Sequence, residues 1–204
     1  MTKLAHAAAS LLLRYPDPDV FAAADDMTLA LPLVRDKKVR HSLTAFVTWF
    51  NNVGMDTARE HYVSTFDFQR QCSLYLTYYR HGDTRARGMA LVGLKHTYRT
   101  AGHAPPDNEL PDYLPLLLEF AAAEPDSGKR LLVQCQAGLE LLRRGLGACQ
   151  SPYQHVVSAV CATLPAPGKR QRATISKLAA EGPPSEEVGL EPFAPPEAME
   201  GTTR

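Results

Sequence analysis

Residues 131–149 read LLVQCQAGLELLRRGLGAC, and the spacing of their apolar side chains decides the fold class. The apolar side chains recur at intervals of three and four: Leu131, Cys135, Leu139, Leu142, Leu146 and Cys149. An α-helix has about 3.6 residues per turn, so this spacing places them on one face. The stretch therefore predicts a helix with one buried face.

The same helical period recurs over residues 39–53 and 153–164. Apolar and polar residues nowhere alternate over enough positions to indicate a β-strand. Glycines at positions 82, 102 and 168 stand where helices should end. We therefore predict an all-α fold, a single-domain bundle of about eight or nine helices with short links.

The composition limits both the domain number and the class of partner. The chain has 204 residues, 45% of them hydrophobic, and 22 basic side chains against 22 acidic ones. That length suits one domain. A formal charge of zero argues against a general nucleic-acid binder, whose affinity comes from Lys and Arg on phosphates. A regulatory scaffold that binds DNA through Lys169, Arg170 and Arg172 stays open only as a third hypothesis.

The end of the chain differs in composition from the rest. Residues 181–204 hold six Glu, one Arg and five Pro, and such a stretch cannot bury enough apolar area to fold. A proline-rich break over residues 165–168 closes the last strong helix. We predict a helical domain over residues 1–164, a basic linker and weak helix over 165–180, and a disordered acidic tail over 181–204.

The cysteines and the N-terminus indicate the compartment. The four cysteines form no C-x-x-C pair, and the seven histidines share no ligand spacing, so no metal site is predicted. Reduced core cysteines suit the cytoplasm. The apolar run Leu4–Leu13 lacks a cleavage site and is expected to be a first helix rather than a signal peptide. No stretch is apolar for long enough to span a bilayer, so stable membrane insertion is not expected.

The candidate site lies where aromatic residues concentrate. Residues 62–79 hold six aromatic side chains: Tyr62, Phe66, Phe68, Tyr75, Tyr78 and Tyr79. Each alone is compatible with a core position. As a group they carry more hydroxyls than a core needs, and tyrosine offers apolar area with a polar tip, which suits a peptide-binding surface.

Charged residues follow in two further stretches. The first, HGDTRARG over residues 81–88, contains Asp83 and Arg85, and Asp83 could also be only a helix cap. The second, over residues 109–120, carries Asp112 and Glu119 on either side of an apolar helix start. Each of these two could be a helix cap, a solvated charge or a carboxylate beside a groove. No motif for a catalytic serine, a phosphate loop, a zinc protease or a dinucleotide site is present.

Taken together, these residues form two blocks. The first comprises Glu60-His61-Tyr62-Val63, Phe66-Asp67, Arg70, Ser73-Leu74, Leu76, His81-Gly82-Asp83-Thr84-Arg85, Arg87-Gly88 and Ala90. The second comprises Glu109-Leu110-Pro111-Asp112, Leu114-Pro115 and Leu118-Glu119. With the early run Leu13-Arg14-Tyr15-Pro16-Asp17, they resemble the NarJ/NarW-type nitrate reductase assembly chaperones of the TorD-like family, over roughly residues 4–164. The chain departs from the family pattern at Thr65 and Tyr113, where Leu and His are common.

The resemblance implies a TorD-like, cytoplasmic, monomeric chaperone without enzymatic activity. Such a protein binds the N-terminal segment of the catalytic α subunit of a respiratory nitrate reductase while the molybdenum cofactor and an iron-sulfur cluster are inserted, before membrane attachment. The molybdenum cofactor, a molybdopterin guanine dinucleotide, would belong to the client and not bind stably here. An amphipathic client helix needs apolar walls and acidic rims. The client-binding residues expected are Tyr62, Phe66, Asp67, Arg70, Leu74, Tyr75, Tyr78, Asp83, Arg85, Asp112, Leu114, Leu118 and Glu119. The alternative is a helical enzyme or small-molecule carrier whose pocket uses Cys72, the histidines and Arg85.

Overall fold

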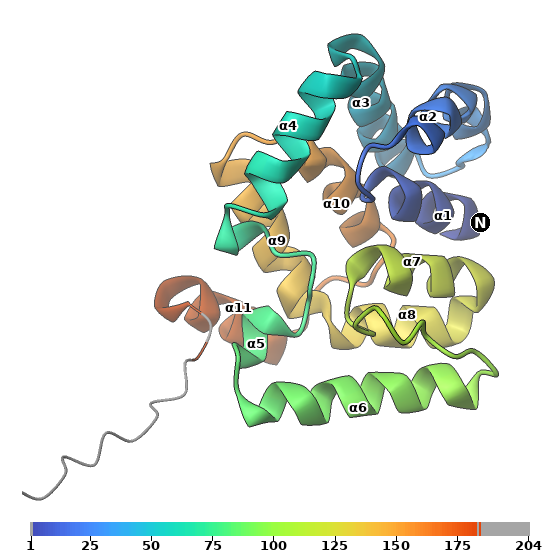
Figure 1. The fold of residues 1–204 in the computed structure, drawn as a ribbon. Coiled ribbons are helices and arrows are strands. Elements are labelled where there is room, and N and C mark those ends of the chain that lie inside the picture. The colour runs from blue at the N-terminus through green and yellow to red at the C-terminus, as the bar shows by residue number, and fades with distance from the viewer. Residues whose placement is uncertain (1, 183, 185–204) are drawn as a thin grey trace, which may run out of the picture.

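A computed structural model describes residues 2–182 and residue 184, and all of its regular elements are helical (Figure 1). The helices are α1 (Thr2–Leu12), α2 (Pro18–Ala30), η1 (Leu31–Leu33), α3 (Lys37–Val53), α4 (Met55–Phe66), η2 (Arg70–Cys72), α5 (Tyr78–His81), α6 (Arg85–Thr100), α7 (Leu114–Ala123), α8 (Pro125–Gln134), α9 (Gln136–Ala148), α10 (Tyr153–Ala162) and α11 (Lys169–Glu181). The elements η1 and η2 are 3₁₀ turns. The predicted all-α class is confirmed.

The described residues form more helices than the eight or nine predicted, partly because one predicted helix is divided. The break falls at Cys135, which ends α8 and begins α9. The apolar face nevertheless continues across it, since Leu131 and Leu139 are both buried. Spacing thus identified the buried face correctly but could not show that the helix axis changes direction there.

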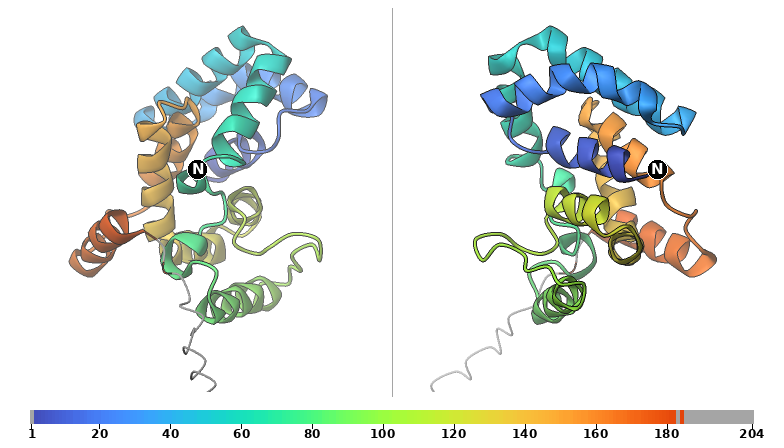
Figure 2. Two further views of the ribbon diagram at one scale, coloured as in Figure 1. Left: turned by 60° about the vertical axis from the view of Figure 1, so that its left-hand side comes forward. Right: turned by 90° about the vertical axis from the view of Figure 1, so that its right-hand side faces the viewer.

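The helices pack as an irregular bundle rather than as parallel columns (Figures 1 and 2). α1 packs against α7 and α10, α3 packs against α2 and α10, and α9 lies between α10 and α11. The centre of the upper half is aromatic: the ring of Phe46 lies 4.8 Å from that of Tyr153 and 5.6 Å from that of Phe50. All three side chains are buried, so they form a rigid base for the neighbouring helices.

Two glycines in α9 allow the segment from η2 to Leu76 to lie directly on that helix. A Cβ at Gly145 would stand 2.3 Å from the backbone oxygen of Gln71, and one at Gly138 would stand 2.4 Å from that of Leu76. Glycine weakens a helix interior by about 1 kcal/mol. That cost is offset here by the close approach of residues 71–76, which places this segment in the fold.

The C-terminal region is described only in part. α11 ends at Glu181 and buries Ile175, while residue 183 and residues 185–204 lie outside the described residues. Most of the predicted acidic tail therefore falls outside them, although its first residue, Glu181, belongs to α11. The three-part division of the chain stays a prediction.

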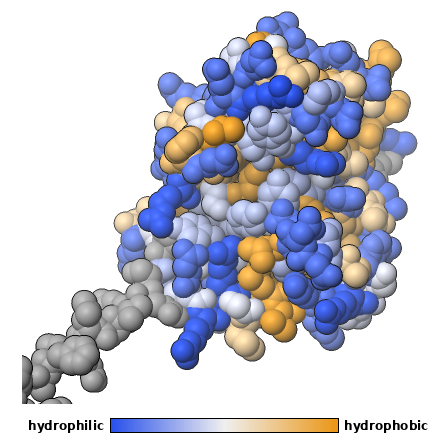
Figure 3. All heavy atoms as spheres, in the orientation of Figure 1, coloured by the Kyte–Doolittle hydropathy of each residue, from blue (hydrophilic) through white to orange (hydrophobic). Residues whose placement is uncertain are grey.

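The surface combines hydrophilic and apolar groups. The face seen in Figure 3 is largely hydrophilic, with apolar side chains gathered in its lower part, where α6 lies. Met89 and Val92 of this helix are exposed. Within the described residues, no helix has both the length and the apolar character needed to cross a bilayer.

Candidate functional site

The segment between α4 and α5 forms the frame of the site. Its backbone is held on one side by the hydroxyl of Tyr79, which donates to the carbonyls of Gln71 (2.9 Å) and Ser73 (3.0 Å). On the other side the N–H of Leu114 donates to the carbonyl of Leu74 at 2.9 Å. An isolated antiparallel bridge pairs Tyr75 with Tyr113 next to this bond. The segment is therefore fixed between α9 and the start of α7.

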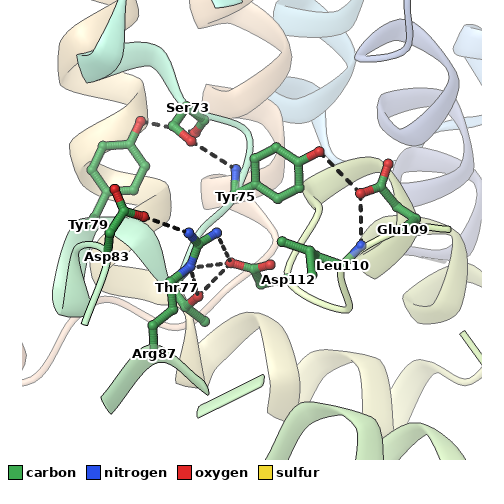
Figure 4. A network of polar contacts seen from close by, with 9 residues as sticks. All are labelled: Ser73, Tyr75, Thr77, Tyr79, Asp83, Arg87, Glu109, Leu110 and Asp112. Atoms are coloured by element: carbon green, nitrogen blue, oxygen red, sulfur yellow. Dashed lines mark hydrogen bonds and ion pairs between the residues drawn. The ribbon is translucent and has the colours of Figure 1, made fainter. Parts of the chain in front are cut away.

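Asp112 connects the two sequence blocks from inside the protein (Figure 4). Its side chain is completely buried, and its Oδ2 accepts hydrogen bonds from the backbone N–H of Thr77 (3.1 Å) and from the Thr77 hydroxyl (2.5 Å). The carbonyl of Asp112 accepts from the N–H of Leu76 at 3.1 Å. Buried donors need such partners, so Asp112 joins the loop before α7 to residues 76–77.

Arg87 extends this network to the surface (Figure 4). Its guanidinium lies 3.1 Å from Oδ1 of Asp83 and 3.7 Å from Oδ2 of Asp112, and its side chain is only 17% exposed. The same group stands 6.0 Å from the ring centre of Tyr75 and 5.9 Å from that of Tyr78. These are cation–π distances, so one charged group orients both rings.

A groove of about 250 Å³ opens beside these residues. It is lined by Phe66, Asp67, Gln69, Arg70, Ser73, Tyr75, Tyr78, Asp83 and Arg87. The aromatic side chains are partly exposed, and the two carboxylates are exposed. The structure thus brings together six of the predicted site residues, from α4, η2, α5, the links between them and the link from α5 to α6.

Four of the other predicted residues lie in the core rather than on a groove wall. Leu74, Leu114 and Leu118 are buried, the last two completely. Tyr62 is also buried, and its hydroxyl donates to the carbonyl of Leu13 at 3.2 Å. Their apolar spacing is that of core residues on helices and on a packed segment.

Two predicted charges, Asp112 and Arg85, do not lie on the rim of the groove. Asp112 is neither a rim carboxylate nor a helix cap, because it is buried and bonded to Thr77. Asp83 does line the groove, but it is not a cap: Thr84 precedes α6, and Asp83 pairs with Arg87. Arg85 is exposed at the first position of α6 and does not line the groove.

Glu119 lines a second hollow of about 530 Å³ between the end of α1 and the start of α7. Its lining residues are Ser10, Arg14, Tyr15, Asp17, Glu109, Tyr113, Pro115, Leu116 and Glu119. The hydroxyl of Tyr75, which lines the groove, donates to Oε1 of Glu109 in this hollow at 3.1 Å. Burial and the nearby Glu109 raise the pKa of Tyr75 to about 12, so the phenol stays protonated and can donate. The groove and the second hollow are therefore connected by the hydrogen bond between Tyr75 and Glu109.

Sequence reasoning missed Arg87, Thr77 and Glu109 as site residues. Arg87 belongs to the same HGDTRARG stretch as Arg85, and only the structure shows which arginine turns inward. One available signal was the pairing of an aspartate with an arginine four residues later, which places them on the same side of a helix start. No local sequence pattern predicts the hydrogen bonds between Thr77 and Asp112, which lie 35 residues apart.

The described residues do not form the cysteine and arginine pocket of the alternative hypothesis. Cys72 is fully buried, and burial together with the neighbouring Cys149 raises its pKa to about 12. A thiol with such a pKa is a weak nucleophile at neutral pH. Among the hollows lined by described residues, neither the groove nor the second hollow includes Cys72 or Arg85. Among the described residues, no group of His, Cys, Asp or Glu is placed to hold a metal ion.

The chain matches one protein family and several known proteins. The family described as nitrate reductase delta subunit matches residues 35–157, which include every residue that lines the groove. The nitrate reductase-like protein NarX of Mycobacterium tuberculosis is 38% identical over 156 residues, which make up 76% of this chain and 23% of NarX. The chain thus spans less than a quarter of NarX.

Two further relatives match over most of their own lengths. The Bacillus subtilis (strain 168) protein NarJ, named as a probable nitrate reductase molybdenum cofactor assembly chaperone, is 34% identical over 170 residues, covering 83% of this chain and 92% of NarJ. A crystal structure of an Archaeoglobus fulgidus protein named for redox enzyme maturation superposes with a TM-score of 0.60 at 19% identity, over 80% of this chain and 93% of that one. At that identity the likeness concerns the fold alone.

Proposed function

The chain belongs to the nitrate reductase delta subunit family, and from this we propose that it is the assembly chaperone of a respiratory nitrate reductase. In this role it acts in the cytoplasm, without catalysing a reaction. It holds the catalytic α subunit by its N-terminal segment while the molybdenum cofactor and an iron-sulfur cluster are inserted. Release of the client then precedes attachment to the membrane. The cofactor is cargo for the client, and no residue of this chain is assigned to bind it.

The observation that carries the proposal is the groove, whose lining residues all lie within the stretch that matches the family. Phe66, Tyr75 and Tyr78 give it apolar walls with polar tips, and Asp67 and Asp83 stand exposed at its edge. An amphipathic peptide helix could place apolar side chains between the rings while its cations reach the carboxylates.

The charges favour a basic client when the second hollow is included. The groove and the hollow together carry five carboxylates, on Asp17, Asp67, Asp83, Glu109 and Glu119. They carry three guanidinium groups, on Arg14, Arg70 and Arg87. The difference, five minus three, leaves two negative charges, and Arg87 is already paired with Asp83. Basic residues of a client would therefore be attracted to the joint surface, chiefly through faster association.

The expected affinity is compatible with release. Three or four apolar anchors contribute about 1.5–3 kcal/mol each when fully buried. Association and ordering of the peptide cost several kcal/mol. The remainder corresponds to a dissociation constant of roughly micromolar or somewhat lower. A chaperone that must hand over its client needs no tighter complex.

Co-purification tests the proposal directly. The tagged chain is expressed together with the catalytic subunit of the reductase from the same source, either complete or lacking its N-terminal segment. We expect the complete subunit to be retained and the shortened one to be lost. Equal retention of both would place the contact elsewhere on the client. Retention of neither, with both chains folded, would contradict the chaperone role.

A further inference from the structure

Two cysteine sulfurs approach each other where η2 meets the end of α9. Sγ of Cys72, the last residue of η2, lies 3.9 Å from Sγ of Cys149, the residue that follows α9. Cys72 is completely buried, whereas Cys149 is partly exposed. The amide of Gln71 donates to the Cys149 sulfur at 3.1 Å, so the two chain segments are already in contact at this point.

The geometry lies close to that of a disulfide. A disulfide bond is about 2.05 Å long, so the sulfurs must approach by a little under 2 Å. Side-chain rotation and a small shift of one backbone segment can supply that distance. One sulfur sits on a single 3₁₀ turn and the other at a helix end, and such places move more readily than a helix interior.

We propose that Cys72 and Cys149 form a reversible dithiol–disulfide site whose oxidant is a low-molecular-weight disulfide. Cys149 is the residue that such an oxidant can reach. Its thiolate attacks one sulfur of the small disulfide, so that a mixed disulfide forms and the first small thiolate leaves. Cys72 then loses its proton and attacks the Cys149 sulfur, and the second small thiolate leaves as the protein disulfide forms.

Protons and electrons balance in this reaction. Two protein thiols lose two protons and two electrons, and the small disulfide gains them to become two small thiols. The order of attack follows from burial. The raised pKa of Cys72 makes it slow to ionise, so it acts second, on a sulfur already held beside it.

The remaining cysteines provide controls. Cys135 and Cys161 make no sulfur–sulfur contact within the described part of the chain. Burial raises the pKa of each to about 12. A Cys161→Ser variant therefore removes a thiol of similar character without touching the pair.

Closing the bond would act on one side of the groove. Arg70 belongs to η2 and Ser73 follows it, and both line the groove. Drawing Cys72 toward α9 must move η2 against Gly145, where the backbone oxygen of Gln71 is already in close contact. Oxidation should therefore alter the position of Arg70 and Ser73. This consequence for client binding rests on the proposed function, whereas the disulfide itself does not.

The test uses the full chain in its native state. The reduced protein is incubated with oxidised glutathione, quenched with acid and treated with a maleimide, and its non-reduced peptides are analysed by mass spectrometry. We expect a loss of two hydrogen masses, a peptide that joins Cys72 to Cys149, and full reversal by dithiothreitol. Cys161→Ser should behave in the same way, and Cys149→Ser should form no such bond.

Two chemical results would overturn the proposal. One is a stable glutathione adduct on Cys149 with Cys72 still free, which would show that the pair cannot close. The other is a cross-link through Cys135 or Cys161, or none at all, while circular dichroism shows a folded protein. Binding of the client peptide gives a separate readout: we expect at least a threefold change in affinity on oxidation. An unchanged affinity would refute only the link to the groove.

Discussion

Replacing Asp112 by alanine should lower the free energy of unfolding by about 3–5 kcal/mol, and the structure shows why. The carboxylate is completely buried and holds both the backbone N–H and the hydroxyl of Thr77. Alanine would leave both donors buried without a partner. A hydrogen bond to a charged group contributes about 1.5–3 kcal/mol, so the two together account for most of the loss. The guanidinium of Arg87, at 3.7 Å, adds a smaller share.

Asparagine at the same position separates hydrogen bonding from charge. Oδ2 of Asp112 makes all of the side-chain contacts named above, whereas Oδ1 is buried without a partner. The side-chain oxygen of asparagine can take the place of Oδ2 and accept from Thr77. Its amide nitrogen then takes the place of Oδ1, which makes no hydrogen bond in the wild type. Asp112→Asn should therefore cost about 1–2 kcal/mol, mainly through the lost charge opposite Arg87 and a weaker acceptor.

Urea denaturation followed by circular dichroism measures both variants against the wild type. Peptide titration on the folded asparagine variant shows whether the groove keeps its shape. An alanine variant within 1 kcal/mol of the wild type would refute the reasoning, because the Thr77 donors would then have found other partners. So would an asparagine variant as unstable as the alanine variant. The asparagine variant could also be stable while its association with a basic peptide becomes far less sensitive to salt. That result would show that the charge of Asp112 acts directly on the client.

Three further predictions follow from the packing, the burial and the groove. Gly145→Ala should destabilise the chain by about 1–3 kcal/mol because its Cβ would meet a backbone oxygen at 2.3 Å, whereas Gly93→Ala, with nothing within 4 Å, should stabilise by up to about 1 kcal/mol; thermal melts that rank them the other way would contradict the packing. Burial lowers the pKa of His6 below its ordinary 6.5, so the unfolded chain binds the proton first. This contribution to stability is therefore present above pH 6.5 and lost as the pH falls through the lowered value, and denaturation of His6→Gln should show a flatter pH dependence. Tyr78→Ala should weaken binding of the client peptide by at least about 1 kcal/mol, while Phe68→Ala, 77% exposed and outside the groove, should not; calorimetry showing equal losses would remove the groove from the binding surface.

The fold could be predicted from the sequence to the extent that helical spacing reports buried faces. Leu139, Leu142 and Leu146 were placed on one apolar face, and all three are buried. The direction of each helix is set by contacts between distant segments, which the spacing does not encode. The break at Cys135 and the single turn of α5 were accordingly not predicted.

The groove could be predicted from its aromatic residues because their density is a local property. Phe66, Tyr75 and Tyr78 stand close in the sequence and close in the structure. Leucines at 114 and 118 were misplaced because apolar spacing is the same for a core face and for a groove wall. Asp112 was misplaced for a different reason: a carboxylate is normally exposed, and its burial depends on Thr77, 35 residues away.

The arrangement explains why an arginine stands in a groove expected to take a basic peptide. A bare guanidinium would repel the client's cations, yet Arg87 is placed between the rings of Tyr75 and Tyr78. The guanidinium forms ion pairs with the exposed carboxylate of Asp83 and the buried carboxylate of Asp112. It can therefore orient the rings while adding little positive potential at the surface. A buried carboxylate is costly unless it is bonded and paired, and Thr77 and Arg87 supply the bonds and the counter-charge. On the proposed function, Asp112 would contribute to recognition without touching the client, by fixing the residue that orders the groove's walls.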